Sequence, residues 1–489
     1  MPPTIASRNA ARVGLTSKMA DESTSRHGRP TPRHDARPAT IEAVVARAAE
    51  DGVRLVRFLY CDPSGLIRGK NVHVDRLAKR MREGVGMTRA QNAVNMLEDL
   101  VHVEGMEPVG EIRIVPDPRT YTVLPWVPRT ASLLCDQLDH DGTDWGSCPR
   151  SFLKRAIAMA AQAGLGVMAA FENEFYLAEE VDGVVRPYRD GPVYSSAGMD
   201  RVAGVMDEIV SAVESQGMEI EQAINEYGPG QQEIAVRYTD ALAAADNQVK
   251  FRDAVRGVAE VQHGLIASFA AKPFEAGVGS GAHVHFSLWS ADGETNLLYD
   301  PAAGDRLLAD VGRRFVAGVL SHLPALVALT CPSFNSYERL RPGAWAGSTV
   351  SWGYDNRECS VRVASPFRGR EMESTNIELK ACDPSCNPYL ALGGLILAGL
   401  DGIQRRAEPP EPARHDPARL SAEEKERSGI APLPTSLREA LAELQADPVL
   451  FPALGDLLGR CLVGVRTAEI EKLEAMTPED ARLAHLRIF

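Results

Sequence analysis

The sequence predicts an α+β protein in which a small β-containing domain is followed by one large α+β domain. The first observation is that β-like runs are interleaved with long helical segments over residues 240–271 and 387–405. These runs read "GVMAAFENEFYL", "QQEIAVRY", "HVHFSLW", "ECSVRVAS" and "TNIELKA". The second is a change to helical periodicity at about Ser151, after a boundary rich in Gly and Pro. We therefore expect one domain over residues 39–140 and a second over residues 141–489.

The segment before the first domain has a different composition. Residues 1–38 are rich in Arg, Ser, Pro and His and contain few large apolar residues. Such a segment buries too little apolar surface to fold, so we expect a disordered tail. A second methionine, Met19, makes an over-extended start the simplest explanation for it.

Turn and cap signals define the elements of the first domain. The stretch "TIEAVVARAAE", residues 40–50, predicts a short amphipathic helix capped by Thr40. Two β-rich runs flank "DPSG" within residues 53–74, and this predicts a hairpin because Asp, Pro and Gly suit a tight turn. The domain extends to about residue 135 and ends in the proline-rich "VPDPRTYTVLPWVP". Beyond residue 407 a second Pro-rich link, "EPPEPARHDP", leads into a helical tail.

Composition excludes several functional classes. A formal net charge of −13 argues against a nucleic-acid-binding surface, because phosphate contacts need clustered Lys and Arg. No run approaches the roughly 18 apolar residues of a membrane span. The eight cysteines lack paired CxxC spacing, and the closest pair, Cys382 and Cys386, has no further ligands at a spacing that suits zinc. We expect reduced, mostly buried thiols in a cytoplasmic protein.

Two carboxylates stand out in the run "AAFENEFYL", residues 169–177. Side chains two apart on a strand project from the same face, so Glu172 and Glu174 are expected to be near neighbours. Carboxylates held this close repel each other, and burial penalises both, so the pair needs cations, protons or water. An edge strand with both acids in solvent is the alternative that this stretch alone leaves open.

Further residues with chemical potential lie on other β-like runs. The stretch "INEYGPGQQEIAV" carries Glu226 and Glu233, and "VGSGAHVHFSLW" carries His283 and His285 after a glycine-rich loop. The stretch "TNIELKACDPSCNPYL" carries Glu378. Arginines follow in "FNSYERLRPG" and "DNRECSVRV", namely Arg339, Arg341, Arg357 and Arg362. Taken singly, the histidines can be core-edge residues, the arginines a solvated face and the glycines a turn.

The combination indicates a metal-dependent reaction. Five carboxylates with an imidazole form an oxygen-rich ligand set, which suits Mg²⁺ or Mn²⁺ better than zinc. Divalent ions together with several arginines are typical of phosphoryl transfer, where catalysis depends on positioning and on neutralising charge.

Six motifs in order resemble the glutamine synthetase family of the bacterial class I type, from about residue 40 to the C-terminus. They read FENEF, NEYGPGQQE, KPFEAGVGSGAHVHFS, NSYERLRPG, DNRECSVRV and IELKACDPSCNPYLALGGLILAGLDGI. The resemblance implies an N-terminal β-grasp domain and a catalytic domain with a curved antiparallel sheet flanked by helices. It also implies active sites shared between neighbouring subunits of a homo-oligomeric ring, usually a double hexamer.

The resemblance further implies a role for individual residues. Three match the ligands of one divalent ion that orients the acid substrate, namely Glu174, Glu226 and Glu233. Three match the ligands of a second ion that holds the nucleotide phosphates, namely Glu172, His283 and Glu378. Arg339 and Arg357 match residues that grip the acid's carboxylate and the γ-phosphate, and Gly279 matches a glycine of the glutamate loop. His285 and Ser287 match nucleotide-side positions. The implied reaction uses ATP to form an acyl phosphate, which an amine attacks to give an amide.

The match to glutamine-forming members fails at the ammonia site. Those members carry a flap carboxylate just after "RLxPG", where this chain has Ala344 and Trp345. A second ammonium-binding carboxylate is expected near "GVGMTRAQ", where Thr88 is the nearest equivalent. A Trp face accepts an alkylammonium or an apolar amine by cation–π interaction and area burial. Glu338 or Asp355 substituting for the missing charges is the alternative.

Two departures affect the acid side. Val278 stands where the glutamate loop usually has Asn, and Lys380 stands where an arginine is expected, which keeps the charge but loses the bidentate fork. From Asp401 onward the chain contains no tyrosine, which excludes adenylylation of a tyrosine there.

These observations predict an ATP-dependent, Mg²⁺- or Mn²⁺-requiring ligase that joins glutamate to an amine larger than ammonia, like the divergent γ-glutamyl-polyamine or monoamine ligases. Lys380 and Trp345 join Arg339, Arg357 and Gly279 as predicted substrate contacts. True glutamine synthesis is the alternative, and a catalytically inactive structural member of the fold is a further one.

Overall fold

The computed structural model describes residues 39–189, 191–303 and 308–489. The predicted disordered tail, residues 1–38, lies outside the described residues. Within them, no helix has the length and apolar character that crossing a membrane requires. All eight cysteines belong to the described part and are buried free thiols, as predicted.

The N-terminal elements begin as the cap and turn signals predict. Helix α1 (Ile41–Glu50) starts after Thr40, whose side chain accepts a hydrogen bond from the Ala43 N–H. Strands β1 (Leu55–Cys61) and β2 (Ile67–His73) pair antiparallel, with Cys61 opposite Ile67 across the "DPSG" turn. The hairpin prediction is therefore confirmed.

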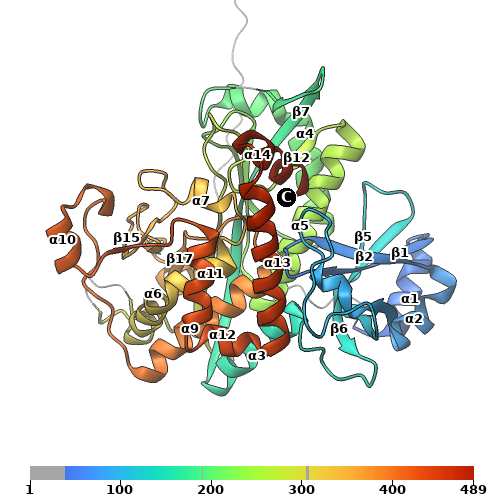
Figure 1. Ribbon diagram of the computed structural model, residues 1–489, viewed down its shortest axis with the longest axis horizontal. Coiled ribbons are helices and arrows are strands. Elements are labelled where there is room, and N and C mark those ends of the chain that lie inside the picture. Colours follow the sequence, from blue (N-terminus) through green and yellow to red (C-terminus); the bar gives the residue numbers. More distant parts are fainter. Residues whose placement is uncertain (1–38, 190, 304–307) are drawn as a thin grey trace, which may run out of the picture. The chain divides into compact units, whose positions relative to one another are not determined.

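The first sheet has the order β2-β1-β6-β4-β3, with β5 (Thr122–Val123) paired to β6. Figure 1 labels β1, β2, β5 and β6 in the blue to cyan part of the chain. Strand β6 (Thr130–Asp139) runs parallel to β1 and antiparallel to β4 (Glu111–Pro116), which pairs with β3 (Val85–Thr88). Helix α1 contacts α2 (Leu77–Glu83), and both contribute side chains to the buried cluster of this sheet. The predicted β-containing first domain is present, and its boundary at residue 140 stays a prediction.

The second sheet is larger and has the order β15-β16-β17-β13-β7-β10-β9. Its strands are β7 (Leu165–Val181), β9 (Ile220–Asn225), β10 (Gln231–Val236), β13 (Ala282–Ser290), β15 (Trp352–Tyr354), β16 (Val361–Ala364) and β17 (Asn376–Leu379). Three short strands pair with β7 off this path, namely β8 (Val184–Pro187), β11 (Thr239–Asp240) and β12 (Ile266–Ser268). Along this path only β15 and β16 run parallel. The α+β prediction is confirmed.

Helices pack on one face of this sheet because side chains alternate between its two faces along each strand, and the apolar ones share one face. Val284 and Phe286 of β13 and Phe171 of β7 lie in the main hydrophobic cluster, together with side chains of α3, α5, α6 and α9. The bounds of these helices are α3 (Pro149–Gln162), α5 (Ala241–His263), α6 (Asp310–Thr330) and α9 (Pro388–Arg405). The remaining helices are α4 (Ser196–Ser215), α7 (Ser336–Arg339), α8 (Glu371–Ser374), α10 (Ala422–Arg427), α11 (Leu437–Ala446), α12 (Leu450–Leu454), α13 (Asp456–Glu474) and α14 (Pro478–Ile488). Strands β14 (Thr349–Val350) and β18 (Ala431–Pro432) form a separate pair. The face of the sheet opposite these helices is therefore available for polar side chains.

The predicted helical run over residues 240–271 is wrong at its C-terminal end. Helix α5 stops at His263 because Gly264 adopts a left-handed conformation with φ of 64° and caps the helix. The chain then turns into β12, where Ile266 pairs with Ala178 of β7. The alanine-rich "IASFAAK" supports both a helix and a buried strand, so the pattern alone could not locate the break.

A buried histidine links three helices beside the core. His322 of α6 places Nε2 2.9 Å from Oδ2 of Asp401 on α9 and Nδ1 2.7 Å from Oδ2 of Asp447, which follows α11. Burial opposes a charge on His322, but the hydrogen bonds with Asp447 and Asp401 outweigh it and raise the pKa of the imidazole. The charged ring is thus the form that this junction stabilises.

Replacing His322 should therefore change the pH dependence of stability. A raised pKa contributes stability that is full below the unfolded pKa of about 6.5 and is lost as the pH rises through the folded value. The free energy of unfolding of His322→Gln should fall below wild type by roughly 1 kcal/mol at about pH 6, since solvent screens part of the interaction. The deficit should shrink toward pH 9 in urea titrations. A deficit that grows with pH would contradict the charged-histidine assignment.

Candidate active site

The pairing register gathers the predicted site residues on the face of the second sheet opposite the helices. Glu174 of β7 lies opposite Glu233 of β10, and Glu172 lies opposite His283 of β13. His285 lies opposite Glu378 of β17, which lies opposite Arg362 of β16. Because these residues are an even number of positions apart on each strand, they share one face. The edge-strand alternative for Glu172 and Glu174 is excluded, since β7 has neighbours on both sides.

One group of residues forms around Glu172. Its Oε2 is 2.9 Å from Nε2 of His285 and 3.6 Å from Nδ1 of His283. Nδ1 of His283 is also 3.3 Å from Oε1 of Glu378. Nδ1 of His285 is 2.9 Å from Oδ1 of Asn376. Both imidazoles therefore reach the two carboxylates that the sequence assigns to one ion.

A second group forms around Glu174. Oε2 of Glu174 accepts hydrogen bonds from the Gly281 N–H at 2.9 Å and from Nε2 of Gln231 at 3.0 Å. Glu226, which follows β9, accepts hydrogen bonds from the Tyr227 N–H at 2.8 Å and from the Tyr194 hydroxyl at 3.3 Å. Glu233 is buried, and Glu174 and Glu226 are half-buried. Three carboxylates thus share a region that is partly shielded from water.

The chain compensates the charges of the second group only in part, through Arg339 near Glu174 and Arg357 near Glu226. Burial raises the pKa of Glu174 to about 7, and the nearby charges of Glu226 and Glu172 add to that rise. Burial followed by repulsion from Glu172, Glu174 and Glu226 raises the pKa of Glu233, and burial raises the pKa of Glu226. A group of acids that resists ionisation in this way is suited to receive a divalent cation.

The charges of the first group are compensated. Burial opposes ionisation of Glu172, but hydrogen bonds from His283 and His285 outweigh it and hold the pKa well below its usual range. Burial is likewise outweighed at His285, whose pKa is raised to about 9 by Glu172 and Glu378. Burial and the charge of Lys380 lower the pKa of His283 to about 4, so this ring stays neutral. A neutral imidazole is the form that binds metals.

The structure thus offers two descriptions of the predicted second metal site. By distance, the group of three whose ligand atoms all approach within 4.8 Å is Glu172, His285 and Glu378, in the described part of the chain. By protonation, His283 is the imidazole with a lone pair to donate. His283 was the predicted ligand and His285 the predicted nucleotide contact, and the geometry brings both to the same two carboxylates.

Basic side chains lie beside the carboxylates. Arg339 of α7 is buried, and its Nη2 contacts Nε2 of His283 at 3.2 Å and the Lys380 carbonyl at 3.3 Å. Its Nη1 is a buried donor without a partner among the described residues. Lys380 Nζ is 3.4 Å from Oε1 of Glu378, and Arg362 Nε is 2.6 Å from Oε2 of the same residue. Arg357 is exposed on the turn before β16, and its charge lowers the pKa of Glu226, against burial. The unused donor of Arg339 fits an anionic substrate group.

The glycine-rich loop packs closely against this cluster. A Cβ at Gly279 would lie 2.4 Å from Cγ of Arg339, and one at Gly281 would lie 2.5 Å from Nε2 of His283. Glycine is required at both positions by close approach. The predicted nucleotide contact Ser287 is buried on β13, and its hydroxyl accepts a 2.8 Å hydrogen bond from the Trp289 indole.

The segment after Arg341 exposes a tryptophan. Trp345 has a φ of 53°, which is rare for a bulky side chain, and 54% of its surface is exposed. Gly343 also has a positive φ, of 75°. Burial raises the pKa of Glu358, and the backbone N–H groups of Trp345 and Gly343 oppose that rise. The Glu358 carboxylate therefore faces the backbone of this flap.

The two carboxylates named as substitutes for the missing ammonia site are engaged elsewhere. Glu338 Oε2 accepts a 3.1 Å hydrogen bond from Arg482 of α14. Asp355 accepts hydrogen bonds from the backbone N–H and the hydroxyl of Ser365. Thr88, at the end of β3, is neutral. We therefore assign neither Glu338 nor Asp355 to ammonium binding.

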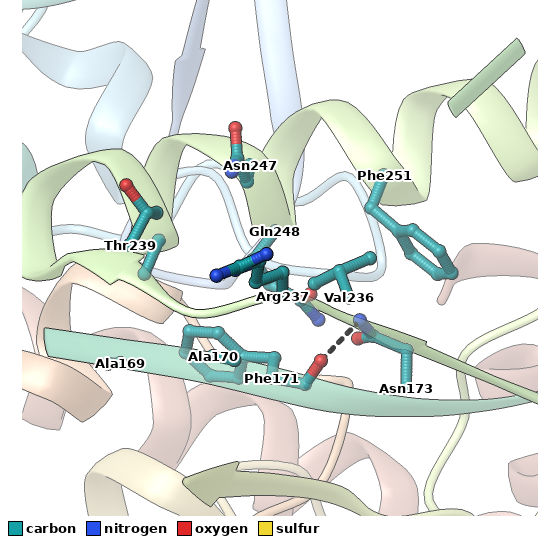
Figure 2. A pocket seen from close by; sticks show the side chains of 11 residues that line it. Ala169, Ala170, Phe171, Asn173, Val236, Arg237, Thr239, Asn247, Gln248 and Phe251 are labelled. Atoms are coloured by element: carbon teal, nitrogen blue, oxygen red, sulfur yellow. Dashed lines mark hydrogen bonds between the residues drawn. The ribbon is translucent and has the colours of Figure 1, made fainter. Parts of the chain in front are cut away.

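A small pocket lies on the opposite side of β7 from the carboxylates. Figure 2 shows it between β7, α5 and the residues around β11, with Asn173 donating to the Phe171 carbonyl. Asn173 lies between the two glutamates in sequence, yet its side chain points to the helix side. The pocket is small and shares no side chain with the carboxylate cluster. The predicted chemistry therefore belongs to the open face of the sheet.

Sequence reasoning missed two residues that act on the carboxylates. Gln231 donates to Glu174, to the Gly279 carbonyl at 3.1 Å and to the Ser280 hydroxyl at 3.2 Å. Tyr194, whose backbone has a φ of 54°, donates to Glu226. Gln231 lies two residues before Glu233 on the same strand, and this period-2 spacing was the signal available for it.

These pKa shifts predict that metal binding depends on pH. A cation must displace the proton of Glu174, so affinity for Mn²⁺ should rise from about pH 6 to about pH 8, through the pKa near 7. Titration calorimetry in buffers of different ionisation enthalpy should detect proton release at pH 7. An affinity that stays constant across this range would contradict a metal site at Glu174.

Two family models match the chain. Residues 39–145 match the family described as glutamine synthetase N-terminal domain, and residues 146–483 match glutamine synthetase, catalytic domain. A γ-glutamylpolyamine synthetase of Streptomyces coelicolor is 36% identical over 456 residues, covering 92% of this chain and 97% of the relative. A glutamine synthetase of Halobacterium salinarum is 34% identical over 421 residues, covering 85% and 89%. Among solved structures, a glutamine synthase homologue has a TM-score of 0.79 at 31% identity, covering 89% of this chain and 99% of that chain. An ADP complex of a protein named GmaS has a TM-score of 0.79 at 29% identity, covering 90% and 98%.

Proposed function

The chain belongs to the glutamine synthetase family, and we propose that it joins glutamate to a primary amine larger than ammonia in an ATP-dependent reaction. Members of this family are ligases that form C–N bonds and use ATP with divalent metal ions. The observation that carries the proposal is the flap, where Trp345 stands in place of a carboxylate. The likeness to a γ-glutamylpolyamine synthetase supports it.

The described residues fit the two ions that this reaction needs. Glu174, Glu226 and Glu233 would hold one ion, because their charges are compensated only in part and favour a cation. Glu172 and Glu378 with His283 would hold the other. When bound, Mg²⁺ or Mn²⁺ supplies neutralisation of the phosphate charge. We propose His285 and Ser287 as nucleotide-side contacts.

The basic residues suit an acid substrate and a transferring phosphoryl group. Arg339 is buried and rigidly placed between His283 and the Lys380 carbonyl, and its free Nη1 can donate to a carboxylate. Arg357 is exposed near Glu226, where a cation can meet an incoming phosphate or carboxylate. Lys380 and Gly279 complete the proposed acid contacts. These residues position and neutralise, which is the main contribution of protein to phosphoryl transfer.

The amine site favours a cation carried on an apolar chain. The exposed indole of Trp345 offers cation–π attraction and apolar surface. Glu338 is hydrogen-bonded to Arg482 and Asp355 to Ser365, so both carboxylates are poorly placed to hold a small ammonium ion. An alkylated amine also buries apolar surface against the indole, which an ammonium ion lacks.

One observation favours the alternative, true glutamine synthesis. Glu358 places a carboxylate against the flap backbone at Gly343 and Trp345, and this charge can serve an ammonium ion. Glutamine synthetases also match the chain over most of its length. An inactive structural role is disfavoured, because all six proposed ligands are present.

A substrate grid separates these functions. Phosphate release from ATP should be measured with glutamate and related acids against ammonia, monoamines and polyamines, with Mg²⁺ or Mn²⁺. The proposal expects glutamate with a larger amine to give the highest kcat/KM. If ammonia is the best nitrogen donor, the function is glutamine synthesis instead. If no combination of acid and amine releases phosphate, the inactive structural role is the remaining explanation.

Assembly and location remain proposals. We propose a closed homo-oligomeric ring, a double hexamer, in which the first domain of one subunit completes the site of the next, and a cytoplasmic location. Sedimentation that finds a fully active monomer would overturn the ring.

A further inference from the structure

The loop that carries Val278 and Gly279 is held by an unusual lysine contact. Lys272 precedes this loop, and its Nζ donates to the carbonyls of Phe274 at 3.2 Å, Glu275 at 3.2 Å and Gly277 at 2.5 Å. An ammonium group has three N–H donors, so these three carbonyls use all of them. The lysine side chain thus closes a tight turn over residues 274–277 from the inside.

The backbone of the same lysine is fixed to the helix that bears Arg339. The Lys272 N–H donates to Oδ1 of Asn335 at 2.6 Å, and the Lys272 carbonyl accepts from Nδ2 of Asn335 at 2.9 Å. Asn335 is buried and directly precedes α7, which ends at Arg339. Lys272 therefore connects the arginine helix, through its backbone, with the glycine-rich loop, through its side chain.

Other contacts hold the far side of the loop against the sheet. The Tyr176 hydroxyl donates to the Val278 carbonyl at 2.9 Å, and its ring packs edge-on against Phe274. Gln231 donates to the Gly279 carbonyl at 3.1 Å. Side chains from outside the loop therefore donate hydrogen bonds to every backbone carbonyl from Phe274 to Gly279 except that of Ala276.

This arrangement sets the distance between Gly279 and Arg339. Gly279 leaves no room for a Cβ beside Arg339 Cγ, so a shift of the loop would change the space next to the guanidinium. Because Lys272 fixes the loop and α7 together, it controls that space without lining it.

We infer that Lys272 is a positioning residue for the acid substrate, holding the loop of residues 274–279 in register with Arg339. The inference rests on the proposed function, because it takes Gly279 and Arg339 as acid contacts. A purely structural lysine would stabilise the fold and leave the substrates equally affected. A positioning lysine affects the acid selectively.

The variant Lys272→Met keeps the length of the side chain and removes all three donors. Its KM for glutamate should rise about 10-fold or more, from the loss of an ordered loop, while its KM for ATP stays within about 2-fold. The variant Lys272→Arg should show most of the same defect, because a planar guanidinium cannot converge on three carbonyls. Lys425→Met, on the distant surface helix α10, is the matched control and should resemble wild type.

A measurement without turnover separates this inference from the proposed function. Hydrogen exchange of the full-length chain should become faster in peptides covering residues 274–281 of Lys272→Met, and stay unchanged in Lys425→Met. Faster exchange supports the positioning role of Lys272 even if the wild-type protein fails to ligate glutamate. That failure would refute the proposed function alone. Unchanged exchange in this loop, or an equal rise of KM for acid, amine and ATP, would overturn the positioning role.

Discussion

Glu174→Gln should be inactive yet more stable than wild type when metal is absent. The amide keeps the size of the side chain and can accept the hydrogen bond from the Gly281 N–H, so the loop contact at 2.9 Å has a replacement. It removes the negative charge that a divalent ion requires, and turnover should fall by at least about 100-fold, as expected for loss of a metal ligand. Phosphate release under saturating ATP, acid and amine measures this loss.

The same substitution that removes activity should raise stability, because it removes charge repulsion. In the metal-free protein above about pH 7, Glu174 is an ionised, half-buried carboxylate repelled by Glu226 and Glu172. Replacing it by a neutral amide removes that repulsion, so the melting temperature at about pH 8 with a chelator should rise. Added Mn²⁺ should then stabilise wild type and have little effect on the variant.

Glu180→Gln is the matched control, because Glu180 lies on the same strand and pairs with Arg487 on the surface. It should keep wild-type turnover and metal response. Wild-type activity in Glu174→Gln, or a melting temperature below that of wild type without metal, would remove Glu174 from the metal site.

Much of the fold follows from local pattern. The Thr40 cap and the "DPSG" turn predict α1 and the first hairpin, because caps and turns depend on a few adjacent residues. The strands that carry Glu233, His285 and Glu378 follow from their short β-like runs. The end of α5 did not, because Gly264 breaks a helix only where tertiary pairing of β12 with β7 rewards the break.

Local sequence pattern likewise predicts one part of the candidate site and not the rest. Period 2 within a strand predicts that Glu172 and Glu174 are neighbours, but only the register between strands brings Glu233 and Glu378 to them. Register depends on the whole sheet and is invisible in one segment. The resemblance of motif order supplied that missing step. The contacts of Gln231, Tyr194 and Lys272 join residues 32 to 57 positions apart or lie within a loop without periodicity. Apart from the period-2 spacing of Gln231 and Glu233, no pattern indicated them.

The proposed amine site has one residue on the flap, Trp345, that we expect to set its selectivity. Trp345 follows a Pro-Gly pair, its own backbone is left-handed, and its indole is more than half exposed. A side chain held outward in a strained conformation indicates a functional constraint more than a packing one. Gly343 has a positive φ of 75°, and we propose it as a hinge on which this segment closes over a bound substrate.

Trp345→Glu should therefore shift the amine preference toward ammonia. The new carboxylate gains an ion pair with NH₄⁺ and the lost indole removes aromatic area, each worth roughly 1 to 2 kcal/mol, or about 10-fold in kcat/KM. The ratio of kcat/KM for ammonia to that for the best amine should rise by about 100-fold, while the KM for glutamate and ATP changes little. Trp345→Phe keeps an aromatic face and should retain the original preference, which separates lost area from added charge. If Trp345 only holds the flap in place, both variants should lose activity with every amine equally, so an unchanged ratio in Trp345→Glu would show that the indole does not select the amine.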